Sequence, residues 1–465
     1  MKVFFLQQVK TSKRCPPSLT RSEDEVRRCF LAQVNKFARK KDLHPRYWTN
    51  EKTKAAMFES LERQTELLNA GTQTGRRNHV TSLSTQPWKT KTEKFEAEKE
   101  RQRNVEIEER FNARKVFLLN ACQMYGNSTL FRKIKSAAVR LPPVWPVSNE
   151  SVRYCPIQKT GSTTWRALLL KVRKKMQLEA KRRSRIPKRK ISSLARSLVH
   201  KETSFVFVRE PYSRLMSAYV DKLFCPNTLF WQGTGKYIVK HFRENPSKSS
   251  LRCGHDVTFQ EFISYVIHAQ ETGAHRDGHF IPIHDHCDFC NANYDYIGHL
   301  ETISEDLPYV LNVIHSPVNY SNDYETETLK GSVAWVMKKM RSDIQDCMPL
   351  EEAGRRLWKK LIIRGLIDKY QPFPFIPEKA KNVSQTKFLE EALAAMSRSR
   401  RWEERRQQHT EALREAFSFL PLNQRLKLKK ILFLDFKMFG FDPEPETVFP
   451  RTPFVKEQGF SYFEL

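Results

Sequence analysis

Tyr154 to Trp165 reads YCPIQKTGSTTW, and Phe205 to Ser217 reads FVFVREPYSRLMS. Each segment begins as an apolar run typical of a buried strand, reaches a polar turn and continues with a helical pattern. Open α/β sheets bind ligands at the carboxyl ends of their parallel strands. The two turns therefore predict a site for two separate phosphate-like groups of one nucleotide. They also predict an α/β fold, with a central parallel sheet flanked by helices.

The first turn has the residues that an anion needs. Gly161 tolerates positive φ and lets the backbone approach an oxyanion, and Lys159 is placed to reach over that anion. Ser162, Thr163 and Thr164 fall in the first helical turn, where unpaired N–H groups favour negative charge. In an ATP-binding P-loop the lysine follows the last glycine, whereas here it precedes the glycine. The alternative interpretation is an ordinary capped helix with its lysine in solvent.

The second turn places an arginine at the end of an apolar strand. Arg209 could form a bidentate fork on a phosphate, and Ser217, two turns into the following helix, could add a hydroxyl. Pro211 suits the first turn of that helix. Arg214 lies on nearly the same side as Ser217 and could assist, or could pair with a neighbouring acid. The alternative interpretation of Arg209 is a strand–helix junction whose arginine pairs with a carboxylate.

These residues resemble known motifs. Residues 159–165 resemble the 5′-phosphosulfate loop of sulfotransferases, and residues 209–219 resemble their 3′-phosphate motif. The chain is most similar to Golgi carbohydrate sulfotransferases of the chondroitin/dermatan 4-O-sulfotransferase type. Further similar segments follow in order: 235–243, 256–262, 278–282, 287–302 and 435–441. The resemblance covers most of residues 150–445 and implies a P-loop-like sulfotransferase fold.

The resemblance implies sulfuryl transfer from 3′-phosphoadenosine 5′-phosphosulfate to a hydroxyl of a glycan, with no metal required. Lys159 would stabilise the bridging oxygen as the sulfuryl group leaves, and His279 is the preferred general base. His275, His284 and His286 are its rivals. The residues implied to bind the donor are Lys159, Thr160, Gly161, Ser162, Thr163, Thr164, Arg209, Arg214 and Ser217.

The sequence departs from the family pattern at four places. Gln158 stands where a proline is usual, Ser162 and Thr164 replace a cysteine and an asparagine, and Phe280 replaces a tryptophan. These changes keep the side chains that would bind phosphate. They do not indicate which sugar, or which of its hydroxyl groups, accepts the sulfuryl group.

The histidines and cysteines within residues 284–290 also permit a zinc site, because Cys-x-x-Cys beside histidine is a ligand spacing. Four ligands in so short a segment are cramped for one tetrahedron, and the resemblance implies a disulfide-bearing loop instead. In an oxidising compartment, Cys287 with Cys290 and Cys225 with Cys253 are plausible bridges. Nine cysteines leave at least one unpaired or linked between chains.

The chain carries a formal net charge of +29, which predicts acidic partners. The basic block between Lys171 and Lys190 is either a solvated surface, a nuclear localisation signal or a rim that gathers an acidic glycan. With the resemblance we expect an acidic glycan acceptor and no nucleic acid. The alternative function is a non-catalytic basic protein that binds glycan or nucleic acid on a sulfotransferase-like fold. A small-molecule kinase fits less well, because of the position of Lys159.

We predict three regions: a basic stem with charged helices over 1–145, a sulfotransferase domain over 146–445 and a tail over 446–465. Within the stem, the helical spacing covers Glu23–Lys41 and Lys91–Cys122. Residues 380–424 read as a charged helical segment. We expect it to be plain surface, and contact with the acceptor is the alternative.

Family members are typically type II Golgi membrane proteins, but the chain shows only a brief apolar patch at Val3–Leu6, whereas a membrane span needs about 20 apolar residues. We therefore expect a Golgi-lumenal protein whose membrane anchor is absent from an incomplete N-terminus. Sequons, compatible with a lumenal chain, occur at Asn127, Asn149, Asn319 and Asn382.

Overall fold

The computed structural model describes residues 91–126, 144–147, 150–183, 202–318, 324–344, 346–376, 383–452, 454–455 and 459–465. The chain divides into Met1–Trp88 and Lys89–Leu465, and every described residue belongs to the second unit. The predicted helix Glu23–Lys41, the apolar patch at Val3–Leu6, basic residues 184–190 and the four sequon asparagines lie outside the described residues.

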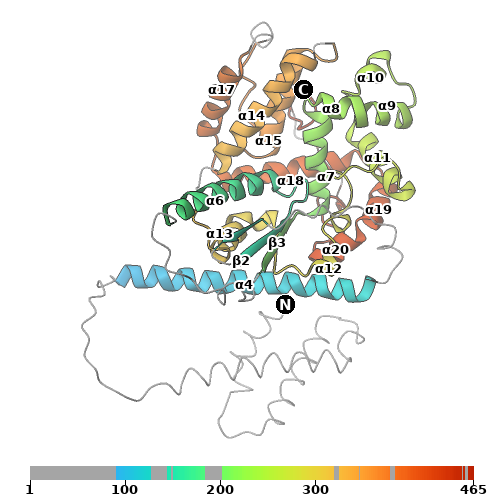
Figure 1. Ribbon diagram of the computed structural model, residues 1–465. Coiled ribbons are helices and arrows are strands. Elements are labelled where there is room, and N and C mark those ends of the chain that lie inside the picture. Colours follow the sequence, from blue (N-terminus) through green and yellow to red (C-terminus); the bar gives the residue numbers. More distant parts are fainter. Residues whose placement is uncertain are drawn as a thin grey trace, which may run out of the picture. The chain divides into compact units, whose positions relative to one another are not determined.

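A four-stranded sheet in the order β1-β2-β3-β4 positions the two predicted turns (Figure 1). The strands are β1 (Val144–Val147), β2 (Glu150–Cys155), β3 (Glu202–Val208) and β4 (Tyr296–His299). Strands β2, β3 and β4 run parallel, and β1 adds an antiparallel edge to β2. The predicted α/β fold with a parallel sheet flanked by helices is confirmed.

Strand β3 lies at the centre of the core because it is apolar on both faces. Phe205 and Phe207 point to one cluster, which includes Trp165 from the helix that precedes β3, and Val206 and Val208 point to the other. All four strand residues are fully buried. This alternation is the period of two that a strand covered on both sides must have.

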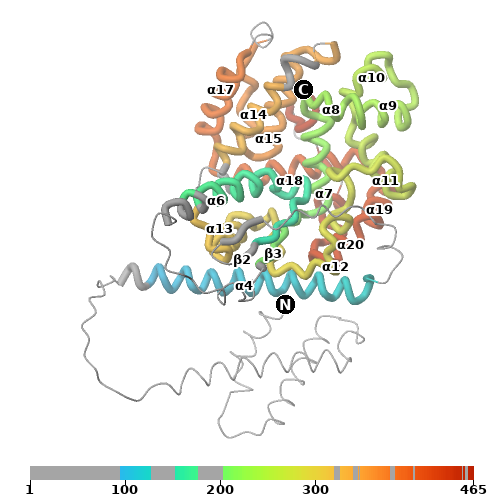
Figure 2. The backbone as a smooth tube through the Cα atoms, in the orientation of Figure 1, coloured from blue at the N-terminus to red at the C-terminus, as the bar shows by residue number. Residues whose placement is uncertain are grey.

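The first crossover runs from β2 through α6 to β3, as the tube trace shows (Figure 2). The helices on the chain up to β4 are α4 (Lys91–Tyr125), α6 (Ser162–Arg183), α7 (Pro211–Tyr219), α8 (Thr228–Phe230), α9 (Lys236–Phe242), α10 (Lys248–Cys253), α11 (Phe259–Thr272) and α12 (Phe289–Ala292). Those after β4 are α13 (Ile303–Val313), α14 (Tyr324–Asp343), α15 (Leu350–Ile363), α17 (Gln385–Arg398), α18 (Trp402–Ser418), α19 (Leu422–Ile431) and α20 (Phe433–Phe439). Short π- or 3₁₀-helical turns occur at Val220–Phe224, Trp231–Gly235, Ile283–Asp285 and Leu300–Thr302.

Helix α4 falls in the region that we predicted as a stem, yet it packs against β4, α12, α13 and α20 (Figure 1). Its buried Arg114 donates to Asp306 Oδ2 at 2.6 Å, and Arg110 donates to Asp306 Oδ1 at 2.8 Å. Asp306 is fully buried, so its charge is met by these two guanidinium groups. The domain boundaries stay predictions, but α4 is an integral part of the unit that holds the sheet.

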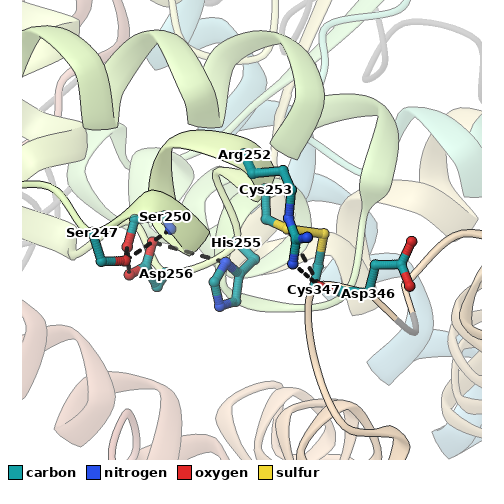
Figure 3. Close-up of a disulfide and its surroundings, with 8 residues drawn as sticks. All are labelled: Ser247, Ser250, Arg252, Cys253, His255, Asp256, Asp346 and Cys347. Carbon is teal, nitrogen blue, oxygen red and sulfur yellow. Dashed lines mark hydrogen bonds and ion pairs between the residues drawn. A yellow bond between two sulfur atoms is a disulfide. The ribbon is translucent and has the colours of Figure 1, made fainter.

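Disulfides join segments that are far apart in sequence. Cys122 of α4 pairs with Cys290, Cys155 at the end of β2 pairs with Cys287, and Cys253 pairs with Cys347. Figure 3 shows the last bridge, where α10 ends beside the segment that carries Asp346, whose carbonyl accepts from Arg252.

Both predicted pairings are therefore wrong. Cys287 comes just before the short helix α12 and Cys290 lies within it, so the two side chains reach different neighbours, Cys155 at the end of β2 and Cys122 of α4. Cys225 is buried as a free thiol, while its predicted partner Cys253 bonds to Cys347.

Among the helices of the described ranges, none combines the length and apolar character that a membrane span requires.

Candidate active site

The loop between β2 and α6 has the predicted geometry of an anion-binding turn. Lys159 and Gly161 both have positive φ, 71° and 81°, which is ordinary for glycine and strained for lysine. The Thr160 hydroxyl is buried and donates to the Ile157 carbonyl at 3.0 Å, so it closes the turn. Ser162 and Thr164 are half-buried at the start of α6 and Thr163 is exposed. The first-turn N–H groups of a 22-residue helix therefore point toward the loop.

Arg209 brings the second turn against the first. Its Nη1 lies 3.5 Å from the Lys159 carbonyl, and its Nε donates to Ser213 Oγ at 3.1 Å. The side chain of Glu210 caps α7 by accepting from the N–H groups of Tyr212 and Ser213, and Pro211 occupies the first turn as predicted. The two motifs predicted to share one site do lie together.

His409 of α18 contacts the guanidinium group of Arg209. Its Nε2 lies 2.9 Å from Arg209 Nη2 and 2.7 Å from Ser213 Oγ, and its Nδ1 lies 3.3 Å from the Ile363 carbonyl. Burial and the Arg209 charge lower the pKa of His409 to about 3. A neutral ring that donates from Nδ1 to a carbonyl must accept at Nε2, so His409 orients Arg209 without adding charge.

Arg214 joins the loop between β2 and α6 (residues 156–161, named the donor loop after its predicted role) to the segment that carries His279. Its guanidinium, with the residue 1% exposed, donates to the carbonyls of Gln158 at 2.9 Å, Ile281 at 2.6 Å and Gly278 at 3.1 Å. These contacts favour a positioning role over the predicted contact with the donor. Ser217, one turn further along α7, is half-buried.

His279 forms a dyad with Asp277. The Asp277 carboxylate accepts from His279 Nδ1 at 2.7 Å and from the His279 backbone N–H at 2.7 Å. Burial would raise the pKa of Asp277, but the hydrogen bonds from His279 lower it below its usual value. In this tautomer His279 Nε2 carries the lone pair that a general base needs. A Cβ at position 278 would lie 3.2 Å from the Gln158 amide nitrogen, so the segment that carries the dyad passes close to the β2–α6 loop.

The rival histidines have other contacts. His284 is buried and its Nδ1 lies 2.6 Å from Asp435 Oδ1. His286 lies 3.4 Å from Arg214 Nη2, and burial together with that guanidinium lowers its pKa to about 3. His275 is exposed and stacks near Tyr237. His284 and His279 both have Nδ1 against a carboxylate, but the His284 side chain is 5% exposed with its Nε2 3.4 Å from Asp285 Oδ1, whereas the His279 side chain is 26% exposed. His279 is therefore the one of these two whose Nε2 an acceptor could reach.

Lys159 contacts a carboxylate that the sequence analysis missed. Its ammonium forms an ion pair with Asp221 Oδ2, while Lys360 and Arg364 each lie 2.7 Å from Asp221 Oδ1. Burial lowers the pKa of Lys159 to about 7, against the opposing effect of Asp221. Burial would raise the pKa of Asp221, but Arg364 and the two lysines hold it well below its usual range.

Sequence reasoning therefore missed Asp221, Asp277, His409, Lys360 and Arg364. Asp277 could have been found, because it lies two residues before His279 in the same segment. Asp221 lies in the turn that continues α7, Lys360 and Arg364 come from α15 and its C-cap, and His409 comes from α18. Nothing local in the sequence marks these four residues. His409 lies in the segment that we expected to be plain surface.

Three of the four candidate zinc ligands have other partners. Cys287 and Cys290 are in disulfides with different partners, and His284 is bonded to Asp435. The described residues contain no group of three or more side chains placed to hold a metal ion.

Comparisons with known proteins agree with this geometry. The model of the sulfotransferase family matches residues 145–371, which include the donor loop, Arg209 and His279. Carbohydrate sulfotransferase 8 of Mus musculus is 28% identical over 224 residues, 46% of this chain and 53% of that protein. Carbohydrate sulfotransferase 11 of Rattus norvegicus is 39% identical over 112 residues, 23% of this chain and 32% of that protein.

A third relative, carbohydrate sulfotransferase 14 of Danio rerio, is 29% identical over 175 residues, 35% of this chain and 46% of that protein. The chain spans about half the length of the first curated relatives that it matches. No solved structure matches it significantly. The sulfotransferase family model matches residues 145–371, and the three relatives named here are carbohydrate sulfotransferases, so this segment is similar to that family.

Proposed function

We propose that the chain is a carbohydrate sulfotransferase that moves a sulfuryl group from 3′-phosphoadenosine 5′-phosphosulfate to a hydroxyl of a glycan. The observation that supports this most is the contact of Arg209 with the backbone of Lys159. It puts a phosphate-binding fork beside the anion-binding turn, and a donor with a 3′-phosphate and a 5′-phosphosulfate needs both.

The donor fits the residues present. The α6 N-terminus and the Lys159 ammonium would meet the 5′-phosphosulfate, whose reactive sulfuryl group is what the donor supplies. Arg209, oriented by His409 and Ser213, would meet the 3′-phosphate, with Ser217 adding a hydroxyl. The left-handed backbone at Lys159 and Gly161 supports the first assignment, because strained residues cluster where ligands are clamped.

His279 would accept the proton of the acceptor hydroxyl at Nε2 as the oxygen–sulfur bond forms. Asp277 would stabilise the resulting imidazolium, as the carboxylate of a catalytic triad does. On the other side, the bond from sulfur to the bridging oxygen breaks, and Lys159 would stabilise the negative charge that stays on the departing phosphate. Positioning and charge stabilisation supply most of the rate in such transfers.

An acidic glycan is the acceptor class that the charge favours. The exposed basic residues of α6, which include Lys171, Arg173, Lys174 and Lys175, follow directly from the donor loop. The family resemblance adds a Golgi-lumenal location.

The test is transfer of labelled sulfate from the donor to desulfated chondroitin, desulfated dermatan and N-glycan acceptors by the full chain. We expect transfer to at least one acceptor, and a loss of about 100-fold or more in kcat for Lys159→Ala and His279→Ala. Lys248→Ala, an exposed lysine of α10, is the matched control and should match the wild type.

Binding of the donor without transfer to any of these acceptors would favour the second candidate, a non-catalytic basic protein that binds glycan. Its support is the net charge of +29. If Lys159→Ala transferred sulfate at the wild-type rate, the assigned role of the lysine would be refuted.

A further inference from the structure

Three cationic side chains converge on one carboxylate beside the donor loop. Asp221 Oδ2 pairs with Lys159, and Asp221 Oδ1 lies 2.7 Å from both Lys360 Nζ and Arg364 Nη2. Lys360 and Arg364 come from α15 and the residue that ends it, outside both nucleotide motifs. Arg364 also donates from Nη1 to the hydroxyl of Ser332, which is neutral.

The charges of this cluster do not balance. One carboxylate faces two ammonium groups and one guanidinium, and the Lys360 and Lys159 side chains are only 4% and 10% exposed. Buried cations are costly unless they are paired, so the surplus of positive charge favours an anion at this position. An ammonium has three donors and a guanidinium five, so one contact each with Asp221 leaves donors for a second oxyanion.

The turn that carries Asp221 also lies near the proposed base, since Lys222 interacts electrostatically with both Asp221 and Asp277. Asp221 and its neighbour Lys222 belong to the π-helical turn Val220–Phe224, a backbone irregularity that is frequent at functional sites. The Lys222 ammonium lies 4.5 Å from the centroid of the Phe230 ring, and the Phe230 and His279 rings meet edge to face with their centroids 5.2 Å apart. Arg364 is the most exposed of the three cations, at 27%, so the cluster is reached from its side.

We propose that Lys360 and Arg364 form a second oxyanion site beside Lys159, which binds a sulfonate, sulfate or carboxylate group during the reaction. Asp221 holds the three cations at spacings that one oxyanion can contact, since its own carboxylate contacts all three. The oxyanion could be the sulfuryl group of the donor or an acidic group of the glycan acceptor. This inference rests on the proposed function, and it adds residues that the donor motifs do not include.

The first experiment uses inorganic sulfate as the probe, with the full chain saturated with 3′-phosphoadenosine 5′-phosphate, which fills the donor motifs but lacks the sulfuryl group. Sulfate should raise the melting temperature of the wild type in a saturable way. Arg364→Gln should weaken this sulfate affinity about ten-fold, the effect of losing one charge-assisted hydrogen bond. Arg398→Gln removes the same charge from an exposed position on α17 and should leave the sulfate affinity unchanged.

Two further arms identify the source of the oxyanion. If it is the sulfuryl group, Arg364→Gln weakens binding of the intact donor but not of 3′-phosphoadenosine 5′-phosphate. If it is an acceptor group, the variant raises KM for desulfated chondroitin and leaves KM for carboxyl-reduced chondroitin unchanged. Lys360→Met, which keeps the length of the buried side chain, should reproduce whichever effect is seen.

The inference is overturned if Arg364→Gln changes neither sulfate affinity, donor affinity nor acceptor KM while 3′-phosphoadenosine 5′-phosphate still binds. Failure of the proposed function looks different, since the wild type would then bind neither nucleotide. In that case the sulfate titration is made without nucleotide, and equal affinities of the wild type and Arg364→Gln overturn the inference independently.

Discussion

His409 contacts the site from a distant part of the sequence. It lies 200 residues after Arg209, yet its Nε2 accepts from the Arg209 guanidinium at 2.9 Å. The ring touches neither the donor loop nor the proposed base in any described contact, so we regard it as a positioning residue for Arg209. Its neutral state matters, because an imidazolium would repel the arginine that it holds.

We predict that His409→Ala weakens binding of 3′-phosphoadenosine 5′-phosphate about ten-fold, because Arg209 loses a buried hydrogen-bond acceptor. His409→Gln should keep most of the affinity, since an amide can accept from Arg209 and donate to the Ile363 carbonyl. Isothermal titration calorimetry measures both. Equal losses in the two variants would contradict a positioning role through this hydrogen bond.

His409 should also affect how the stability of the folded chain depends on pH in acid. The pKa of His409 is about 3 in the folded chain against an ordinary 6.5, so unfolding takes up a proton between these values. Its contribution to stability is present above pH 6.5 and is lost as the pH falls toward 3. His409→Gln should therefore flatten the pH dependence of the unfolding free energy in this window, which urea titrations at several pH values would measure.

Among the elements, α4 carries the largest departure from the predicted organisation. A long charged helix near the N-terminus is typical of a stem, but here Phe111 and Ile107 are buried against the sheet, and Cys122 is bonded to Cys290. The charged clamp of Arg110 and Arg114 on Asp306 completes the attachment. We infer that a fragment beginning after α4 would lack part of the core.

We predict that Asp306→Asn lowers the free energy of unfolding by about 3 kcal/mol or more, because it leaves the buried Arg114 without a counter-charge. The matched control is Glu305→Gln, which removes the same kind of charge next to it. Glu305 is half-exposed in its pair with Arg110, so that change should cost less than about 1 kcal/mol. Urea denaturation compares the two variants. Similar losses would show that burial of the Asp306 pair does not anchor α4.

At the scale of the whole molecule, the sequence was sufficient wherever structure is local. The strand–turn–helix units at 154–165 and 205–217, the left-handed Gly161 and the pairing of Arg209 with the donor loop follow from short-range pattern and from the geometry of parallel strands. The disulfide pairs did not follow, because spacing along the chain says nothing of which segments meet in the fold. Asp221, Lys360, Arg364 and His409 could not be predicted for the same reason, since each acts through a contact between segments that are far apart in the sequence.

The central claim is that two neighbouring turns bind two separate anionic groups of one nucleotide. The most direct test is equilibrium binding of 3′-phosphoadenosine 5′-phosphate and of adenosine 5′-phosphate to the full chain, beside Arg209→Ala. We predict that the wild type prefers the nucleotide with the 3′-phosphate by about ten-fold or more, and that Arg209→Ala removes this preference. Equal affinity of the wild type for both nucleotides, or no binding of either, would contradict the account.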